Sequence, residues 1–256
     1  MVTPIIEVCA NSAASCVAAE QGGAARVELC AGIPEGGTTP SYGEMVTARR
    51  AIGIQLNVII RPRGGDFLYT PAEVQTMLLD IEAAKAAGAD GVVFGCLNPD
   101  GTIDMERNRQ LKEAAGSLST TFHRAFDVCR DPFEALEQII SLGFDRILTS
   151  GQEASAPQGA GLIAQLVERA AGRIIIMPGC GVNENNVAEL ARTTGAQEFH
   201  MSARHRVEGG MVYRNERVSM GGTVTVEEFA REITDPQRVE NSAVVIAPLI
   251  PWSIAG

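Results

Sequence analysis

The sequence predicts a single (β/α)8 barrel, an α/β fold in which eight parallel strands alternate with helices. Three observations predict it. The chain has 256 residues, close to the roughly 250 typical of one such barrel. Its hydrophobic share of 45% and charged share of 20% are those of a globular domain. A glycine followed by a short β-rich run also recurs four times, at residues 23–30, 88–95, 143–150 and 195–202.

The recurring glycine indicates where helices end, because the residue after a helix often adopts a left-handed conformation that penalises a Cβ atom. The four glycines are 52 to 65 residues apart, which is too long for one strand–helix unit and suits two. Each interval should therefore contain another strand. Apolar or β-branched runs supply these strands at residues 5–9, 55–60, 120–122 and 173–177. Eight such strands favour a closed barrel, and a doubly wound open sheet is the alternative.

Helical patterns separate the expected strands. The clearest spans Pro71–Ala87, where apolar residues recur from Val74 onward at helical spacing behind a proline suited to a first turn. Residues 201–225 are glycine-bearing and basic, which predicts a long loop over the barrel mouth. A C-terminal helix is expected over residues 235–246. The tail 248–256 either docks on a neighbour or is disordered, and residues 1–256 are expected to form one domain.

Composition excludes several classes of partner. The net charge of −10 and pI near 4.9 disfavour binding to nucleic acid or to anionic membranes, which need a basic face. The sequence contains no apolar run of the length that spans a membrane, and its start lacks a basic leader. We therefore expect a cytoplasmic protein. The six cysteines form no CxxC pair, so neither a zinc ribbon nor a disulfide scaffold is indicated.

Polar residues gather where the expected strands end, which is where barrels of this kind build their sites. Charged groups on apolar strands are costly unless they are paired or solvated. They should therefore face each other or a ligand. The candidates for acid/base catalysis are Glu7, Glu28, His123, Asp127 and His200. The alternative is a barrel-filling ion network, with Glu7 and Glu28 against Arg61 and no chemistry.

A glycine loop at residues 178–183 follows the seventh strand and precedes a helix. Glycines let backbone N–H groups approach an anion, and the loops after strands seven and eight often bind phosphate in such barrels. A plain tight turn is the alternative. Together with nearby arginines, the loop predicts a small anionic ligand. The candidate anion-binding residues are Arg61, Arg63, Arg124, Ser150, Gly179, Gly181 and Ser202.

Several of these stretches resemble the CutC family. They are RVELCAG (26–32), EGGTTPS (35–41), IIRPRGGDFLY (59–69), TFHRAFD (121–127), LTSG (148–151) and FHMSAR (199–204). The resemblance covers residues 5–247, and IRPRGGDF with TFHRAFD at this separation is its most specific part. It implies a cytoplasmic TIM barrel that forms a homo-oligomer, a dimer or a tetramer, and that is named for copper homeostasis.

The resemblance also points to Cys9 and Cys30 as ligands of Cu(I). A physical argument agrees, because soft thiolates select Cu(I) and the two cysteines end adjacent strands about 4.8 Å apart. A copper carrier, however, does not need glutamates, arginines, a histidine and a glycine loop at the same mouth. An enzyme acting by acid/base chemistry on a small phosphorylated or carboxylated molecule is therefore the alternative. A plain interaction scaffold is disfavoured, because it would not need buried charge.

Overall fold

The computed structural model describes residues 5–218 and 227–247. Eight parallel strands form one sheet in the order β7-β6-β5-β4-β3-β2-β1-β8. Their bounds are β1 (Ile5–Ala10), β2 (Arg26–Leu29), β3 (Gln55–Ile59), β4 (Gly91–Phe94), β5 (Ser119–Phe122), β6 (Arg146–Thr149), β7 (Ile175–Pro178) and β8 (Glu198–Met201).

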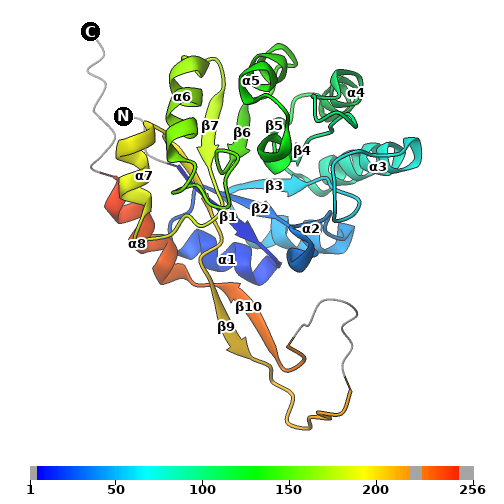
Figure 1. The fold of residues 1–256 in the computed structure, drawn as a ribbon. Coiled ribbons are helices and arrows are strands. Elements are labelled where there is room, and N and C mark those ends of the chain that lie inside the picture. The colour runs from blue at the N-terminus through cyan, green and yellow to red at the C-terminus, as the bar shows by residue number, and fades with distance from the viewer. Residues whose placement is uncertain (1–4, 219–226, 248–256) are drawn as a thin grey trace.

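The sheet curls into a nearly closed barrel (Figure 1). Strand β1 pairs in parallel with both β2 and β8, so the first and last strands of the repeat meet. Strands β7 and β8 contact each other, although no ladder joins them among the described residues. The predicted (β/α)8 barrel is confirmed, and the open doubly wound sheet is excluded.

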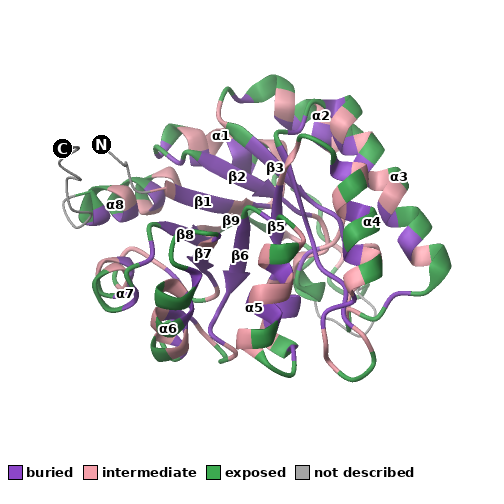
Figure 2. Ribbon diagram, turned by 90° about the horizontal axis from the view of Figure 1, so that it is seen from above, coloured by how far each residue is buried: buried purple, intermediate pink, exposed green. Residues whose placement is uncertain are grey.

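Helices surround the barrel, and their outer faces are exposed while the strands are buried (Figure 2). The expected helix Pro71–Ala87 is α3; it begins at a capping box of Thr70 and Glu73 and ends at Gly88 with φ 84°. No helix in the described part of the chain is long and apolar enough to cross a membrane. The other helices are α1 (Ala13–Gln21), α2 (Tyr42–Ala51), α4 (Met105–Ala115), α5 (Pro132–Ser141), α6 (Ala160–Ala170), α7 (Val187–Thr194) and α8 (Pro236–Ile246), with short 3₁₀ turns η1 (Ile33–Glu35) and η2 (Arg124–Val128).

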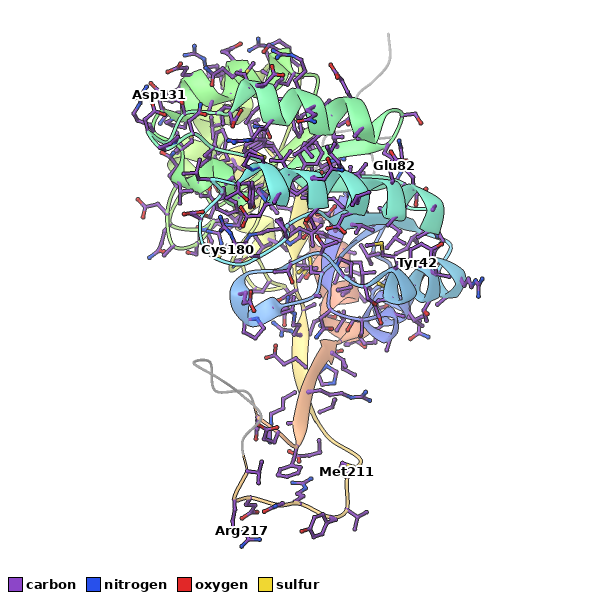
Figure 3. The ribbon with its side chains drawn as sticks, turned by 90° about the vertical axis from the view of Figure 1, so that its right-hand side faces the viewer. Tyr42, Glu82, Asp131, Cys180, Met211 and Arg217 are labelled. Atoms are coloured by element: carbon purple, nitrogen blue, oxygen red, sulfur yellow. The ribbon has the colours of Figure 1, made fainter. Side chains whose placement is uncertain are left out.

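A long loop does follow the eighth strand at residues 209–218, but its predicted place over the barrel mouth was wrong. Residues after β8 form strand β9 (Arg204–Glu208), which pairs antiparallel with β10 (Ala230–Thr234). This two-stranded arm projects away from the barrel (Figure 1), and Figure 3 shows Met211 at its far end, well separated from Cys180 on the barrel. The partner strand lies beyond the segment that we assigned to the loop, so the pairing was not apparent. Residues 219–226 lie outside the described residues.

The C-terminal helix is confirmed. Helix α8 spans Pro236–Ile246, and the side chain of Asp235 accepts the backbone N–H of Gln237 at its start. The helix packs against α1, α7 and β1, and its Arg238 reaches the barrel mouth. The expectations for the tail 248–256 lie outside the described residues.

Candidate functional site

A cavity of about 720 Å³ opens at the carboxyl ends of the strands. It brings together most of the residues that the sequence singled out, because the ends of parallel strands meet at one mouth. The predicted residues that line it are Cys9, Glu28, Cys30, Arg61, His123, Arg124, Asp127, Gly181, His200 and Ser202. Glu7, Arg63, Ser150 and Gly179 are not among the lining residues.

Two cysteines form one wall of the cavity. The register of β1 against β2 pairs Cys9 with Glu28, and Cys30 follows directly after β2. The two sulfur atoms lie 3.7 Å apart, and Arg204 Nη2 donates to Cys9 Sγ at 3.3 Å. The hydrogen bond with Cys30 lowers the pKa of Cys9 well below its usual value, with His200 and Arg204 adding to the lowering and burial opposing it. The pair therefore holds one thiolate before any ligand binds.

The same hydrogen bond and burial raise the pKa of Cys30 well above its usual value. Cys30 accordingly keeps its proton while Cys9 is ionised. The two sulfurs share one proton, which a metal ion would have to displace.

His200 on β8 lies between two carboxyl groups. Its Nδ1 is 2.7 Å from Glu7 Oε1, and its Nε2 is 3.6 Å from Glu28 Oε2. Burial on its own would lower the pKa of His200, but Cys9 and the two glutamates together outweigh burial and raise that pKa well above the usual value. The imidazole is therefore cationic at neutral pH.

Glu28 is almost fully buried and stays protonated. Burial is the largest cause and raises the pKa of Glu28 to about 8; His200 opposes the rise, and the charges of Cys9 and Glu7 add to it. Its Oε1 atom has no hydrogen-bond partner in the described structure. A carboxylic acid that titrates near neutrality in a cavity is suited to proton transfer.

A buried ionic layer lies beneath the cavity. Arg26 pairs with Glu7 and, at 2.5 Å, with Glu198, and Arg146 reaches Glu198 at 3.1 Å. Burial would raise the pKa of Glu7, but Arg26 and His200 together outweigh burial and lower it. The barrel-filling network that we considered for Glu7 thus exists, but its cations are Arg26 and Arg146. Arg61 is not part of it.

The sequence analysis missed Arg26, Arg146 and Glu198, although a signal was present. Arg26 precedes Glu28 and Cys30 by two and four residues, so strand alternation places all three on the same face. Glu198 stands in the same relation to His200.

Arg61, His123 and Phe67 form a second wall of the cavity, next to the cysteines. The Nη atoms of Arg61 donate to the carbonyl oxygens of Glu35, Gly37 and Gly65 at 2.8 to 2.9 Å. The Arg61 guanidinium lies over the Phe67 ring, 5.0 Å from its centroid, and the centroids of the Phe67 and His123 rings are 4.8 Å apart. Burial, aided by the charge of Arg61, lowers the pKa of His123 to about 3, so this imidazole is neutral.

Asp127 and Arg124 brace the ends of β5 and β6. Asp127 accepts the hydroxyl of Thr149 at 2.5 Å and both the amide and the hydroxyl of Ser150 at 2.9 Å. Arg124 donates to Asp127 at 2.7 Å and to Ser150 at 3.0 Å. These contacts engage both oxygens of Asp127 and hold Ser150 outside the cavity lining.

The prediction that Arg63 belongs to the anion-binding set requires it to lie beside Arg61 at the mouth, but it does not line the cavity. Strand β3 ends at Ile59, so strand alternation does not extend to these two arginines. Arg63 pairs instead with Glu73 at 2.5 Å and with Asp66 at 3.0 Å, and its guanidinium lies over the Tyr69 ring.

Of the two glycines predicted to bind an anion in the loop after β7, one lines the cavity and the other does not. Gly181 lines it, with φ 76°, directly after Cys180 with φ 72°. Gly179 packs inward instead, since a Cβ atom there would lie 2.4 Å from Leu148 and 3.3 Å from His200.

Among the described residues, two sets of side chains could hold a metal ion. Cys9, Glu28 and Cys30 form one, Glu7, Glu28 and His200 the other, and in each set the ligand atoms lie within 4.8 Å of one another. The first offers two soft sulfurs, and the second offers only oxygen and nitrogen and already contains a hydrogen-bonded imidazole. Only the first matches the ligand preference of Cu(I).

Known proteins resemble this chain over most of its length. A family model described as the CutC family matches residues 4–205. A family protein CutC of Parabacteroides distasonis is 65% identical over 237 residues, which cover 92% of this chain and 98% of that protein. The copper homeostasis protein cutC homolog of Homo sapiens is 48% identical over 235 residues, covering 92% and 86%. A solved structure of the copper homeostasis protein CutC from Streptococcus agalactiae superposes with a TM-score of 0.75 at 36% identity, covering 78% and 98%.

Proposed function

The chain belongs to the CutC family, and from that premise we propose that it serves copper homeostasis by binding one Cu(I) ion between Cys9 and Cys30. The observation that carries the proposal is the 3.7 Å separation of the two sulfurs. Copper is here the cargo of the protein. Thiolates are the ligands that Cu(I) prefers, and Glu28 is close enough to both sulfurs to contribute an oxygen.

The charges around the pair favour a monovalent cation held by two thiolates. One thiolate is already present at Cys9, so Cu(I) binding has to remove only the proton of Cys30. The complex of two thiolates with Cu(I) carries one negative charge. His200 and Arg204 lie beside it and offset that charge. We therefore expect binding to release about one proton per chain.

We also propose a cellular compartment and an oligomeric state for the protein. A site that needs two reduced thiols suits the cytoplasm, where thiols are kept reduced. The dimer or tetramer that the family resemblance implies stays a prediction.

Anaerobic titration with Cu(I) against a competing chelator tests the proposal. The wild type should bind one Cu(I) per chain, and Cys9→Ser/Cys30→Ser should lose that binding, because hydroxyls are poor ligands for soft metals. Cys180→Ser is the matched control, since Cys180 lines the same cavity but its thiol bonds the Ala154 carbonyl. An unchanged stoichiometry in the double variant would refute the site.

A second candidate function is acid/base catalysis on a small anion, and the protonated Glu28 favours it. Glu28, with a pKa near 8, lines the cavity beside the Cys9 thiolate and the His200 cation. Such a group can give up or take a proton at neutral pH. His123, Asp127 and Glu7 remain in the proposed set, with Asp127 and Glu7 as positioning residues, because their carboxylates are engaged by protein donors. Glu28→Gln should abolish turnover of any substrate while leaving ligand binding intact.

A further inference from the structure

The wall formed by Arg61, His123 and Phe67 contains a buried cation without a counter-ion. Arg61 is 5% exposed, and the hydrogen bonds of its Nη atoms go to neutral backbone carbonyls. No carboxylate of the described residues forms an ion pair with it. The Tyr69 hydroxyl lies beside it, but burial raises the pKa of Tyr69 and keeps that group neutral. A buried charge is costly unless an opposite charge compensates it.

Unpartnered polar atoms accompany this charge. Within the described structure, Arg61 Nε and His123 Nε2 are buried and lack a hydrogen-bond partner, and both residues line the cavity. His123 Nδ1 accepts the N–H of Ala125 at 3.3 Å, so the hydrogen of the neutral ring is on Nε2. Both unpartnered atoms are therefore N–H donors. Buried donors of this kind call for an acceptor, which a ligand can supply.

The two donors belong to one cluster that is fixed in place. The Phe67 ring contacts both the Arg61 guanidinium and the His123 ring. Three backbone carbonyls hold the Nη atoms of Arg61, so its guanidinium cannot turn toward another anion. The cluster adjoins the cysteine wall, because Arg61 bonds the carbonyl of Gly37 and a Cβ atom at Gly37 would lie 3.7 Å from Cys30 Sγ.

We propose that Arg61 and His123 form the subsite for the carboxylate of a small organic acid, whose remainder extends toward Glu28 and Cys9. This inference rests on the second candidate function and names its substrate class. One uncompensated positive charge and one neutral donor match a singly charged, two-oxygen acceptor. A phosphate group carries about −1.5 to −2 charges near neutral pH, more than this wall offsets. Phe67 and Ile59 also line the cavity and suit a short apolar stem.

The test is binding of propionate to the full chain, compared with its neutral isostere propionamide and with inorganic phosphate. Nitrogen-15 NMR of the histidine side chains reports the contact directly. Propionate should shift the Nε2 resonance of His123, and propionamide and phosphate should bind at least about tenfold more weakly, the factor expected for one lost charged hydrogen bond. An unmoved His123 resonance, equal binding of propionamide, or tighter binding of phosphate would each overturn the proposal.

Variants separate this subsite from general effects on the fold. His123→Asn keeps an acceptor for the Ala125 N–H and removes Nε2, and Arg61→Lys keeps the charge and removes the Nε donor. Each should weaken propionate binding about tenfold or more. Arg63→Lys is the matched control and should bind as the wild type does, because Arg63 lies outside the cavity lining. Should both test variants fail to fold, the His123 resonance of the wild type still decides.

The outcomes also distinguish this subsite from the copper proposal. Cys9→Ser/Cys30→Ser should lose Cu(I) and retain propionate, whereas His123→Asn should retain Cu(I) and lose propionate. Loss of propionate binding in the double cysteine variant would contradict a subsite built on Arg61 and His123. Glu28→Gln should still bind propionate. If this variant binds propionate but loses turnover, the result supports the catalytic role of Glu28 and leaves the carboxylate subsite unaffected.

Discussion

Replacing Glu28 by glutamine should make the protein more stable at neutral and alkaline pH, although the change removes an ionisable group from the cavity. Burial raises the pKa of the Glu28 carboxyl to about 8 from an ordinary value of 4.5. A raised carboxyl pKa means that the folded state holds a proton that the unfolded state has released. The wild type therefore loses stability as pH rises from near the unfolded pKa through the folded one. Glutamine resembles the protonated acid and avoids this loss.

The size of the effect follows from the two pKa values. One unit of pKa difference corresponds to about 1.4 kcal/mol. Relative to low pH, this difference lowers the free energy of unfolding of the wild type by about 1 kcal/mol near pH 5, by about 3 kcal/mol near pH 7, and by about 5 kcal/mol above the folded pKa. The free energy of unfolding of Glu28→Gln, relative to the wild type, should thus increase by about 2 to 3 kcal/mol between about pH 5 and pH 7.

Urea unfolding followed by far-ultraviolet circular dichroism measures this difference. Glu82→Gln is the matched control, because Glu82 is exposed on α3 (Figure 3) and forms a surface ion pair with Lys85. Its effect should be small at every pH, as expected for a surface ion pair. A stability difference between Glu28→Gln and the wild type that does not change with pH would refute the raised pKa and the catalytic role built on it.

Three further perturbations follow from the same geometry. Glu7→Gln leaves Arg26 and His200 without their shared carboxylate and should lower the free energy of unfolding in urea by about 3 to 5 kcal/mol at neutral pH. Because the pKa of Glu7 is lowered, this difference should shrink as pH falls below about 4.5. A difference that grows in acid would contradict the lowered pKa. Asp127→Asn should destabilise the barrel by about 1.5 to 3 kcal/mol, since a charged acceptor of the Thr149 and Ser150 donors is lost; no change in the urea midpoint would show that the brace is unimportant. His123 should remain neutral, with its hydrogen on Nε2, from about pH 5 to pH 8 by nitrogen-15 NMR, and a titration within that range would rule out the buried neutral ring.

The fold was predictable because its signals are local and repeat along the chain. A glycine such as Gly88, which ends α3 with a positive φ, marks the end of a helix in the sequence itself. The β9–β10 arm was missed because its strands are separated by an intervening segment, and neither described strand pairs with a strand of the barrel that would indicate a register. Pairing of this kind depends on contacts that composition and periodicity do not encode.

The site was predictable at the level of which strand ends carry it. Glu28 and Cys30 line the cavity because side chains two residues apart along a strand share a face. Arg61 and Arg63 lie beyond the end of β3, where this alternation no longer applies. Which partner each charged side chain takes could not be predicted: Glu7 bonds Arg26 rather than Arg61, and that choice depends on the depth of each residue in the barrel.

Copper K-edge X-ray absorption of the one-to-one Cu(I) complex tests the proposed role most directly, because it identifies the atoms around the metal. The account predicts a first shell dominated by sulfur in the wild type and in Cys180→Ser, and no bound copper with such a shell in Cys9→Ser/Cys30→Ser. A first shell of nitrogen and oxygen in the wild type, or a sulfur shell that survives the double substitution, would contradict Cu(I) binding at Cys9 and Cys30.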